Sequence, residues 1–187
     1  MTANSDHPIF EDIQTQRLDL IPVTTQSLLC QRQNAPDMRK WLGAILHATV
    51  PRAWPPEHWE PHVFEYLLAL IAKEPEAEGW CRYIAIRDKS RYGRTLIGSF
   101  GSGFPKPETE EAEIGYGLLE KWQRKGIAVE AVEAMLPWLK PRRTIKAFVA
   151  QTFPNLYGSI RVLEKTGFEP AGAGYEEGAI LFRKRNE

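Results

Sequence analysis

The sequence predicts a single α/β domain with a late β-hairpin, an arrangement close to an α+β domain. Three observations support this fold class. Several short segments place apolar residues at every second position, as strands do, and several longer ones place them at every third or fourth position, as amphipathic helices do. These two kinds of segment alternate along the chain. A length of 187 residues also suits one domain with a substantial core.

The domain begins with its first alternating segment. Residues 1–13 are polar and acidic, and we expect them to form a flexible N-terminal arm, so that the folded domain spans residues 14–187. Leu18 and Leu20 alternate with charged residues and indicate the first strand. Strands are predicted over residues 15–23, 80–87, 95–101, 112–119, 144–150, a segment that begins at 168, and 179–182.

The helices are indicated by their ends as well as by their apolar stripes. Thr24 or Thr25 can cap the first helix with its hydroxyl, and Pro36 suits the first turn of the second. Gly167 ends the last helix in the usual C-terminal glycine position. Helices are predicted over residues 25–33, 36–46, 56–73, 126–140 and 156–166.

Charge and hydropathy exclude several classes of partner. Lys plus Arg is 24 and Asp plus Glu is 24, so the formal net charge is zero and gives no argument for binding nucleic acid or an anionic membrane. No apolar run approaches the ~20 residues of a membrane helix. The N-terminus lacks the pattern of a secretion signal. We therefore expect a cytoplasmic protein.

The cysteines and histidines indicate no metal or redox site. Cys30 and Cys81 are far apart and lie in no metal-binding or redox motif, so we expect reduced thiols that pack against the core. The histidines form no zinc-like cluster, and we expect no bound metal. They are His7, His47, His58 and His62.

The segment from Gln123 to Ala128 joins a predicted strand to a predicted helix. The first N–H groups of a helix have no partner inside the helix, and its dipole leaves partial positive charge there. The small residues Gly126 and Ala128 keep these groups accessible, and the preceding Arg124 and Lys125 add charge. Such an end can bind a phosphate or diphosphate through main-chain amides. An ordinary helix start with a glycine turn would have the same sequence.

Three motifs in the right order resemble the GNAT family of N-acetyltransferases. Gln123-x-x-Gly126-x-Ala128 matches its Gln/Arg-x-x-Gly-x-Gly/Ala signature in the strand–turn–helix context that the family requires. Glu113-Ile-Gly-Tyr116 and the segment from Ser159 to Phe168 are similar to the RimJ/RimL-like subgroup, which acetylates ribosomal-protein N-termini and related amines. The resemblance covers roughly residues 14–184.

The resemblance implies a fold, a cofactor and a set of contacts. The expected fold is a mixed, mostly antiparallel sheet of about six to seven strands, flanked by helices and splayed at the cofactor cleft. The expected cofactor is acetyl-CoA. The family also places its acceptor between the early helices and the sheet, where the Trp-rich segment 47–60 would either line the cleft or pack against the core. The implied cofactor-binding residues are Gly117, Leu118, Leu119, Gln123, Arg124, Lys125, Gly126, Ile127 and Ala128.

Amine acetylation from a thioester requires deprotonation of the acceptor and stabilisation of the developing charges, but no protein nucleophile. Glu113 is the candidate base; a solvated carboxylate or a partner for an arginine is the alternative. Many family members have a tyrosine where this chain has Leu163. The RimJ/RimL-like subgroup has a serine that matches Ser159, the candidate donor to the thiolate; a residue that caps the helix start is its alternative.

The sequence therefore predicts an acetyl-CoA-dependent N-acetyltransferase. It would transfer the acetyl group to a primary amine, either a protein N-terminus or a small amine, by direct attack in a ternary complex. A non-catalytic acyl-CoA-binding regulatory module on the same fold is the alternative, and the absent tyrosine favours it.

Overall fold

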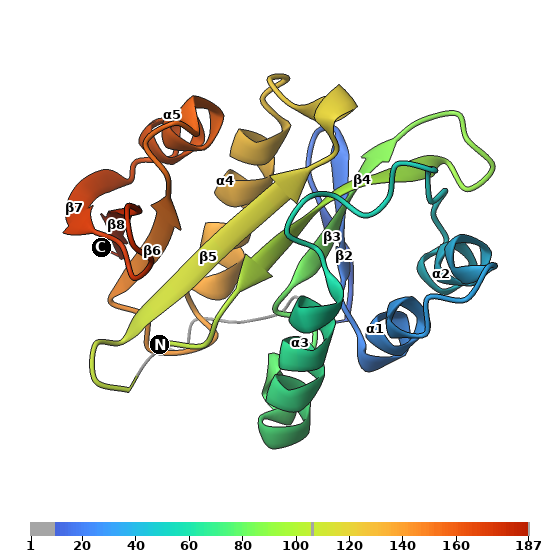
Figure 1. Ribbon diagram of the computed structural model, residues 1–187, viewed down its shortest axis with the longest axis horizontal. Helices are drawn as coiled ribbons and strands as arrows, with labels where there is room; N and C mark the ends of the chain where they lie inside the picture. Colours follow the sequence, from blue (N-terminus) through green and yellow to red (C-terminus); the bar gives the residue numbers. More distant parts are fainter. Residues whose placement is uncertain (1–9, 106, 187) are drawn as a thin grey trace. The chain divides into compact units, whose positions relative to one another are not determined.

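The computed structural model describes residues 10–105 and 107–186 (Figure 1). In this part of the chain, five α-helices and eight strands form an α/β domain, which confirms the predicted fold class. The strands follow the order β1-β2-β3-β4-β5-β6-β8-β7 in a mixed, mostly antiparallel sheet. The chain divides into two compact units. Of the described residues, the N-terminal unit holds 10–100 and 116–123, and the C-terminal unit holds 101–105, 107–115 and 124–186.

A short strand that the sequence did not predict precedes the first predicted strand, residues 15–23, so the sheet has one strand more than the sequence predicts. Strands β1 (Ile13–Gln14) and β2 (Leu18–Pro22) pair antiparallel. Between them Thr15 closes a tight turn, because its Oγ1 accepts a hydrogen bond from Leu18 N at 2.9 Å and its N–H donates to Leu18 O at 3.0 Å. Of the predicted arm, residues 1–9 lie outside the described residues.

The N-terminal unit packs three helices against an antiparallel ladder. β2 pairs with β3 (Arg82–Arg87), and β3 pairs with β4 (Arg94–Ser102). The helices are α1 (Thr25–Arg32), α2 (Met38–Leu46) and α3 (Pro61–Lys73) (Figure 1). One buried apolar cluster joins the three helices to β2, β3 and β4. Two short 3-10 helices, Pro75–Ala77 and Glu120–Trp122, complete this unit.

The residues at the helix starts predict the beginning of α1 correctly, but they place the beginnings of α2 and α3 too early. Thr24 caps α1 in a reciprocal capping box with Ser27. The helix predicted from Pro36 begins at Met38, after Asp37. The helix predicted from residue 56 begins only at Pro61, because His58 has a left-handed φ of 65° that interrupts any helix there.

Both cysteines pack as the sequence predicts. Cys81 is part of the apolar cluster of the N-terminal unit, and Cys30 packs against that cluster. Burial raises the pKa of the Cys30 thiol, which keeps it protonated near neutral pH.

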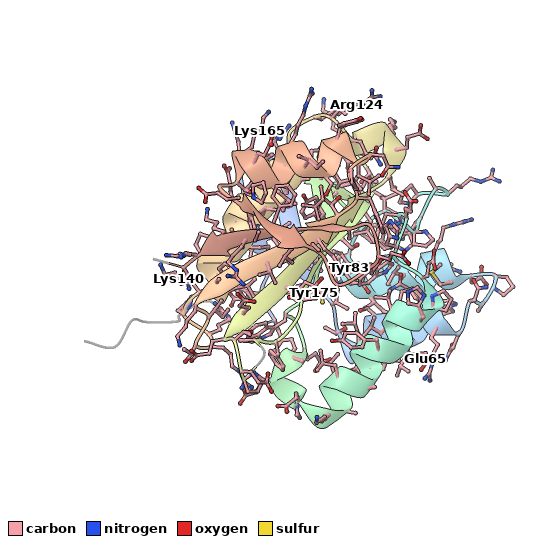
Figure 2. All side chains as sticks on the ribbon, turned by 60° about the vertical axis from the view of Figure 1, so that its left-hand side comes forward. Glu65, Tyr83, Arg124, Lys140, Lys165 and Tyr175 are labelled. Carbon is pink, nitrogen blue, oxygen red and sulfur yellow. The ribbon has the colours of Figure 1, made fainter. Side chains whose placement is uncertain are left out.

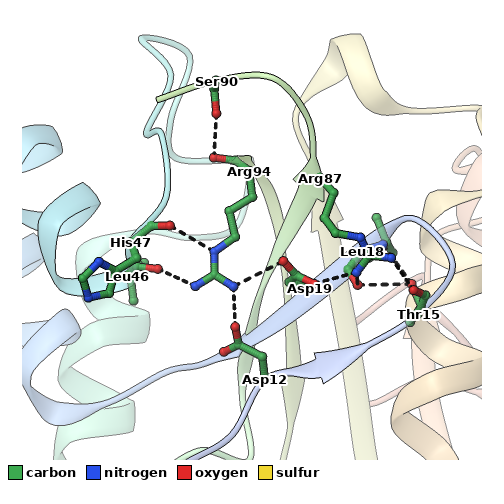
Figure 3. A network of polar contacts seen from close by, with 9 residues as sticks. All are labelled: Asp12, Thr15, Leu18, Asp19, Leu46, His47, Arg87, Ser90 and Arg94. Atoms are coloured by element: carbon green, nitrogen blue, oxygen red, sulfur yellow. Dashed lines mark hydrogen bonds and ion pairs between the residues drawn. The ribbon is translucent and has the colours of Figure 1, made fainter. Parts of the chain in front are cut away.

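Two arginines bind one buried carboxylate and join the strands of the N-terminal unit (Figure 3). Asp19 of β2 pairs with Arg87 Nη1 at 2.6 Å and with Arg94 Nη1 at 3.3 Å. Arg94 also pairs with Asp12 and donates to the carbonyl oxygens of the α2 terminus, Leu46 O among them at 2.7 Å. This network fixes β1, β2 and the end of α2 to the β3–β4 hairpin.

The C-terminal unit contains the parallel part of the sheet. β5 (Glu111–Leu118), which begins in this unit, runs parallel to β6 (Ala147–Thr152). β8 (Ile180–Arg185) pairs antiparallel with both β6 and β7 (Glu169–Ala173). The helices are α4 (Ile127–Leu139), whose Ala131, Val132, Met135 and Leu139 are fully buried, and α5 (Tyr157–Lys165).

The two ion pairs of Asp19 should contribute to the free energy of unfolding. We expect Asp19→Ala to lower the free energy of unfolding by about 3 kcal/mol, because it leaves two arginines without their buried partner. Glu65→Ala removes an exposed ion pair with Arg32, whose atoms lie 3.6 Å apart, and should cost less than about 1 kcal/mol. Urea denaturation of the two variants measures the difference, and equal losses would show that the network adds no stability.

Candidate functional site

The parallel ladder between β5 and β6 is short. It pairs Glu111 with Ala147, Ala112 with Phe148, and Glu113 with Val149. Both strands continue past this point, to Leu118 and Thr152, but no described residue pair beyond Glu113 and Val149 belongs to the ladder. The ladder thus ends at the candidate base, as a sheet splayed at a cofactor cleft requires.

The turn before α4 presents main-chain amides at a helix start. Gly126 is the N-cap residue, with a left-handed φ of 73°, and no side chain caps the first turn. Arg124, which Figure 2 labels, is exposed, as are Lys125 and Gly126. Ile127 and Ala128 are buried and anchor the helix. Gly126 suits this position because only glycine adopts this conformation without steric cost.

Glu113 and Glu111 lie on the same face of β5, because side chains alternate along a strand. The Glu111 carboxylate is almost buried and pairs with Arg183 of β8 at 2.6 Å. Glu113 is half-buried and lies at the last residue pair of the ladder. The structure thus gives Glu111 the role of an arginine partner.

Ser159 is the third residue of α5 and is half-buried. Leu156, not Ser159, holds the N-cap position of this helix, and no side chain caps its first turn. Leu163, where many family members have a tyrosine, lies on the same helix with 1% of its surface exposed. Ser159 therefore does not cap this helix, which was the alternative to its predicted role.

The remaining predicted cofactor residues belong to the N-terminal unit. Gln123 Nε2 donates to Leu118 O at 3.0 Å, and Leu119 N donates to Ile97 O at 2.8 Å, so both strand-end groups are already hydrogen-bonded. A Cβ on Gly98 would collide with Gly117 O and lie 2.6 Å from Leu118 Cδ2. Gly98 therefore allows β4 to approach the end of β5 closely, a role that the sequence signals only through its Ile97-Gly98 pair.

The predicted site residues are thus distributed over both units. The C-terminal unit holds Glu113, Ser159 and the turn from Arg124 to Ala128. The N-terminal unit holds Gly117, Leu118, Leu119 and Gln123.

The donor set fits an anionic cofactor better than a metal ion. In residues 10–105 and 107–186, no group of three or more His, Cys, Asp or Glu side chains could bind a metal. The start of α4, a helix of 13 residues, has a glycine N-cap without a side-chain cap hydrogen bond, next to two exposed cations. Within the described chain, no helix has the length and apolar composition that a membrane crossing needs.

Trp54 and Trp59 do not line an open surface. They are 5% and 4% exposed, and their rings contact Tyr83 at centroid distances of 5.8 and 5.7 Å. Of the two roles open to the Trp-rich segment, these residues therefore take the packing role. The buried Gln31, to which both indoles donate, is a residue that the sequence pattern did not single out.

Acetyltransferases are among the known proteins that are similar to this chain in sequence or structure. The chain is 28% identical over 103 residues to the uncharacterized N-acetyltransferase YjdG of Bacillus subtilis (strain 168), a match that covers 55% of this chain and 60% of that protein. It resembles the ribosomal-protein-S5-alanine acetyltransferase of Vibrio fischeri with a TM-score of 0.63, at 18% identity and coverage of 94% and 97% of the two chains.

A further similar structure is RimL, the ribosomal L7/L12 alpha-N-protein acetyltransferase, in complex with coenzyme A; its TM-score is 0.59 at 17% identity, and coverage is 94% of this chain and 98% of that one. At these identities the structural likeness shows a shared fold. The family model of the acetyltransferase (GNAT) domain matches residues 17–169, so the resemblance of the three sequence motifs is confirmed and the chain belongs to the GNAT acetyltransferase family.

Proposed function

We propose that the protein is an acetyl-CoA-dependent N-acetyltransferase that acts on a primary amine, either a protein N-terminus or a small amine. The observation that carries this proposal is the start of α4, where amides without a side-chain cap follow Arg124 and Lys125. Membership of the family and the early end of the β5–β6 ladder support it. Monomer and homodimer are both compatible with it.

The chain's own residues would hold the cofactor through main-chain groups. The amides at Gly126, Ile127 and Ala128 would bind the diphosphate, and Arg124 and Lys125 would add attraction that salt weakens. The main chain from Gly117 to Leu119 would line the pantetheine arm. Acetyl-CoA supplies the activated acyl group, so the protein has only to orient it and to manage protons.

Glu113 is proposed to accept a proton from the acceptor ammonium, directly or through one water. Its place at the last pair of the β5–β6 ladder supports this role, and the ion pair of Glu111 with Arg183 argues against the neighbouring carboxylate. The amine then attacks within a ternary complex. Ser159 is proposed to donate a hydrogen bond to the leaving thiolate, since Leu163 has no hydroxyl.

A non-catalytic acyl-CoA-binding module is the second candidate, and Leu163 favours it. Release of free thiol from acetyl-CoA, measured across a panel of amines and peptides, distinguishes the two. Turnover with any acceptor supports the enzyme. Tight binding of acetyl-CoA without turnover on the whole panel supports the module.

A glycine comparison tests the cofactor turn. Gly126→Val should raise the dissociation constant for CoA by about tenfold or more, the cost of losing one hydrogen bond to a charged group. Gly93→Val is the matched control, because Gly93 has the same φ of 73° and a Cβ there meets nothing within 4 Å. Both variants carry the same backbone strain. Unchanged CoA affinity in the Gly126 variant by calorimetry would refute the assigned turn.

The two glutamates of β5 test the base. Glu113→Gln should lower kcat/KM by about 100-fold at neutral pH, the usual scale of general-base catalysis. The deficit should shrink between about pH 7 and pH 9, because an α-amino group with a pKa near 8 then loses its proton to solvent. Glu111→Gln should lower kcat/KM much less and lose stability instead. Equal activity losses in the two variants would contradict the assignment.

Ser159→Ala tests the proton donor. We expect kcat to fall by about tenfold, which corresponds to one lost hydrogen bond to a charged group, while the affinity for CoA stays as in the parent. Steady-state kinetics with a saturating acceptor measures kcat. An unaltered kcat would leave Ser159 with a structural role only.

A further inference from the structure

Strand β6 ends in a buried hydroxyl that has no hydrogen-bond partner among the described residues. This hydroxyl is Thr152 Oγ1, and Thr152 is 4% exposed, although residues 153–158, which follow it directly, are all exposed. A buried hydroxyl without a partner costs free energy, and valine has nearly the same shape without this cost. The threonine at this position therefore needs an explanation other than stability.

A second threonine shows how the same unit satisfies a hydroxyl that it buries. Thr166 is also 4% exposed, but its Oγ1 donates to Val162 O at 2.9 Å and to Leu163 O at 3.1 Å. Both threonines belong to the C-terminal unit. Burial alone thus does not leave a threonine hydroxyl without a partner in this unit.

Thr152 lies on the face of β6 that α4 and α5 cover. Side chains alternate along a strand, so Thr152 and Phe148 share one face. Phe148 lines a pocket together with Leu136 of α4 and with Thr166, the residue that ends α5. The side chain of Thr152 is consequently on the helix side of the strand, inside the C-terminal unit.

The end of β6 lies at the same edge of the sheet as the start of α4. β5 and β6 are parallel, so the helix that joins them runs antiparallel to both, and Gly126 lies at the edge where β6 ends. Helix α5 follows β6 directly and has Ser159 in its first turn. Open α/β sheets bind ligands at this kind of edge, beyond the carboxyl ends of their strands.

Thr152 also lies between the candidate base and this edge. Val149, the ladder partner of Glu113, is three residues before Thr152, which corresponds to about 10 Å along a strand. The ladder with β5 has ended before Thr152 is reached. A ligand that extends from the start of α4 toward Glu113 therefore passes the last residues of β6.

We propose that Thr152 Oγ1 forms a hydrogen bond with an amide group of the pantetheine arm of the acyl donor. The inference rests on the proposed function, in which the diphosphate binds at the start of α4 and the amine attacks near Glu113. The arm joins these two points, and each of its amide groups has an N–H donor and a carbonyl acceptor. A hydroxyl both donates and accepts, so it can pair with either group.

Thr152→Val tests this contact through stability and binding together. Without ligand, the midpoint of its urea denaturation should equal or exceed that of the parent, because no buried hydroxyl is left without a partner. Its dissociation constant for CoA, measured by calorimetry with the full chain, should rise about tenfold, the cost of leaving one buried amide unpaired. Its dissociation constant for ADP, which has the diphosphate but no arm, should stay the same.

Two further variants complete the comparison. Thr166→Val is the matched control, because it removes an equally buried hydroxyl that has partners within the chain. It should lower the denaturation midpoint and leave the affinity for CoA as in the parent. Thr152→Ser keeps the hydroxyl and should bind CoA as tightly as the parent does, even if the lost methyl group lowers its stability.

A loss of affinity in Thr152→Val that is confined to CoA, without a loss of stability, supports the proposal. Three results would overturn it and leave the transferase assignment standing: an unchanged affinity for CoA, an equal loss for ADP, or a midpoint that falls as in Thr166→Val. The expected affinities without turnover on any amine refute the transferase and keep the contact of Thr152. If the parent binds no CoA, both proposals fail.

Discussion

The early end of the β5–β6 ladder is the constraint on which the proposed chemistry depends. A parallel ladder that continued to Leu118 would use the main-chain groups of β5 for strand pairing and leave none for a ligand. Because pairing with β6 stops at Glu113 and Val149, one continuous stretch of chain carries the candidate base, a strand end that does not pair with β6, and the amides at the start of α4. The site is thus assembled largely from sequence neighbours.

Close backbone packing positions the strand end from its other side. Because Gly98 has no side chain, the carbonyl oxygen of Gly117 can lie close to it. Because Gly117 has no side chain either, the carbonyl oxygen of Glu57 can lie close to Gly117. The absence of a side chain at both glycines therefore determines the position of the main chain that is proposed to line the cofactor. The Asp19 network acts at a distance from this place, and joins strands whose apolar faces already pack on the helices. Close backbone packing and buried polar contacts thus order different parts of the N-terminal unit.

The sequence predicts those features that depend on neighbouring residues. The alternation of strands and helices, the cap at Thr24 and the glycine turn at Gly126 are all local, and the structure has each of them. The start of α3 and the role of Gln31 were not predictable in this way. The start of α3 depends on the left-handed backbone of His58. The role of Gln31 depends on hydrogen bonds from Trp54 and Trp59, more than twenty residues along the chain, and no local pattern predicts such a pairing.

The hydrogen bonds of the buried Gln31 also have a consequence for redesign of the protein. The indoles of Trp54 and Trp59 donate to Gln31, which donates to Tyr83. The Tyr83 hydroxyl donates to Ser27, whose hydroxyl donates to Thr24 O within the capping box of α1. The segment from Trp54 to Trp59 and helix α1 are therefore held together by these hydrogen bonds and cannot be exchanged independently. Grafting a foreign loop between Pro51 and Glu60 would leave the buried Gln31 Oε1, in the last turn of α1, without its two donors unless the tryptophans were transplanted with the loop.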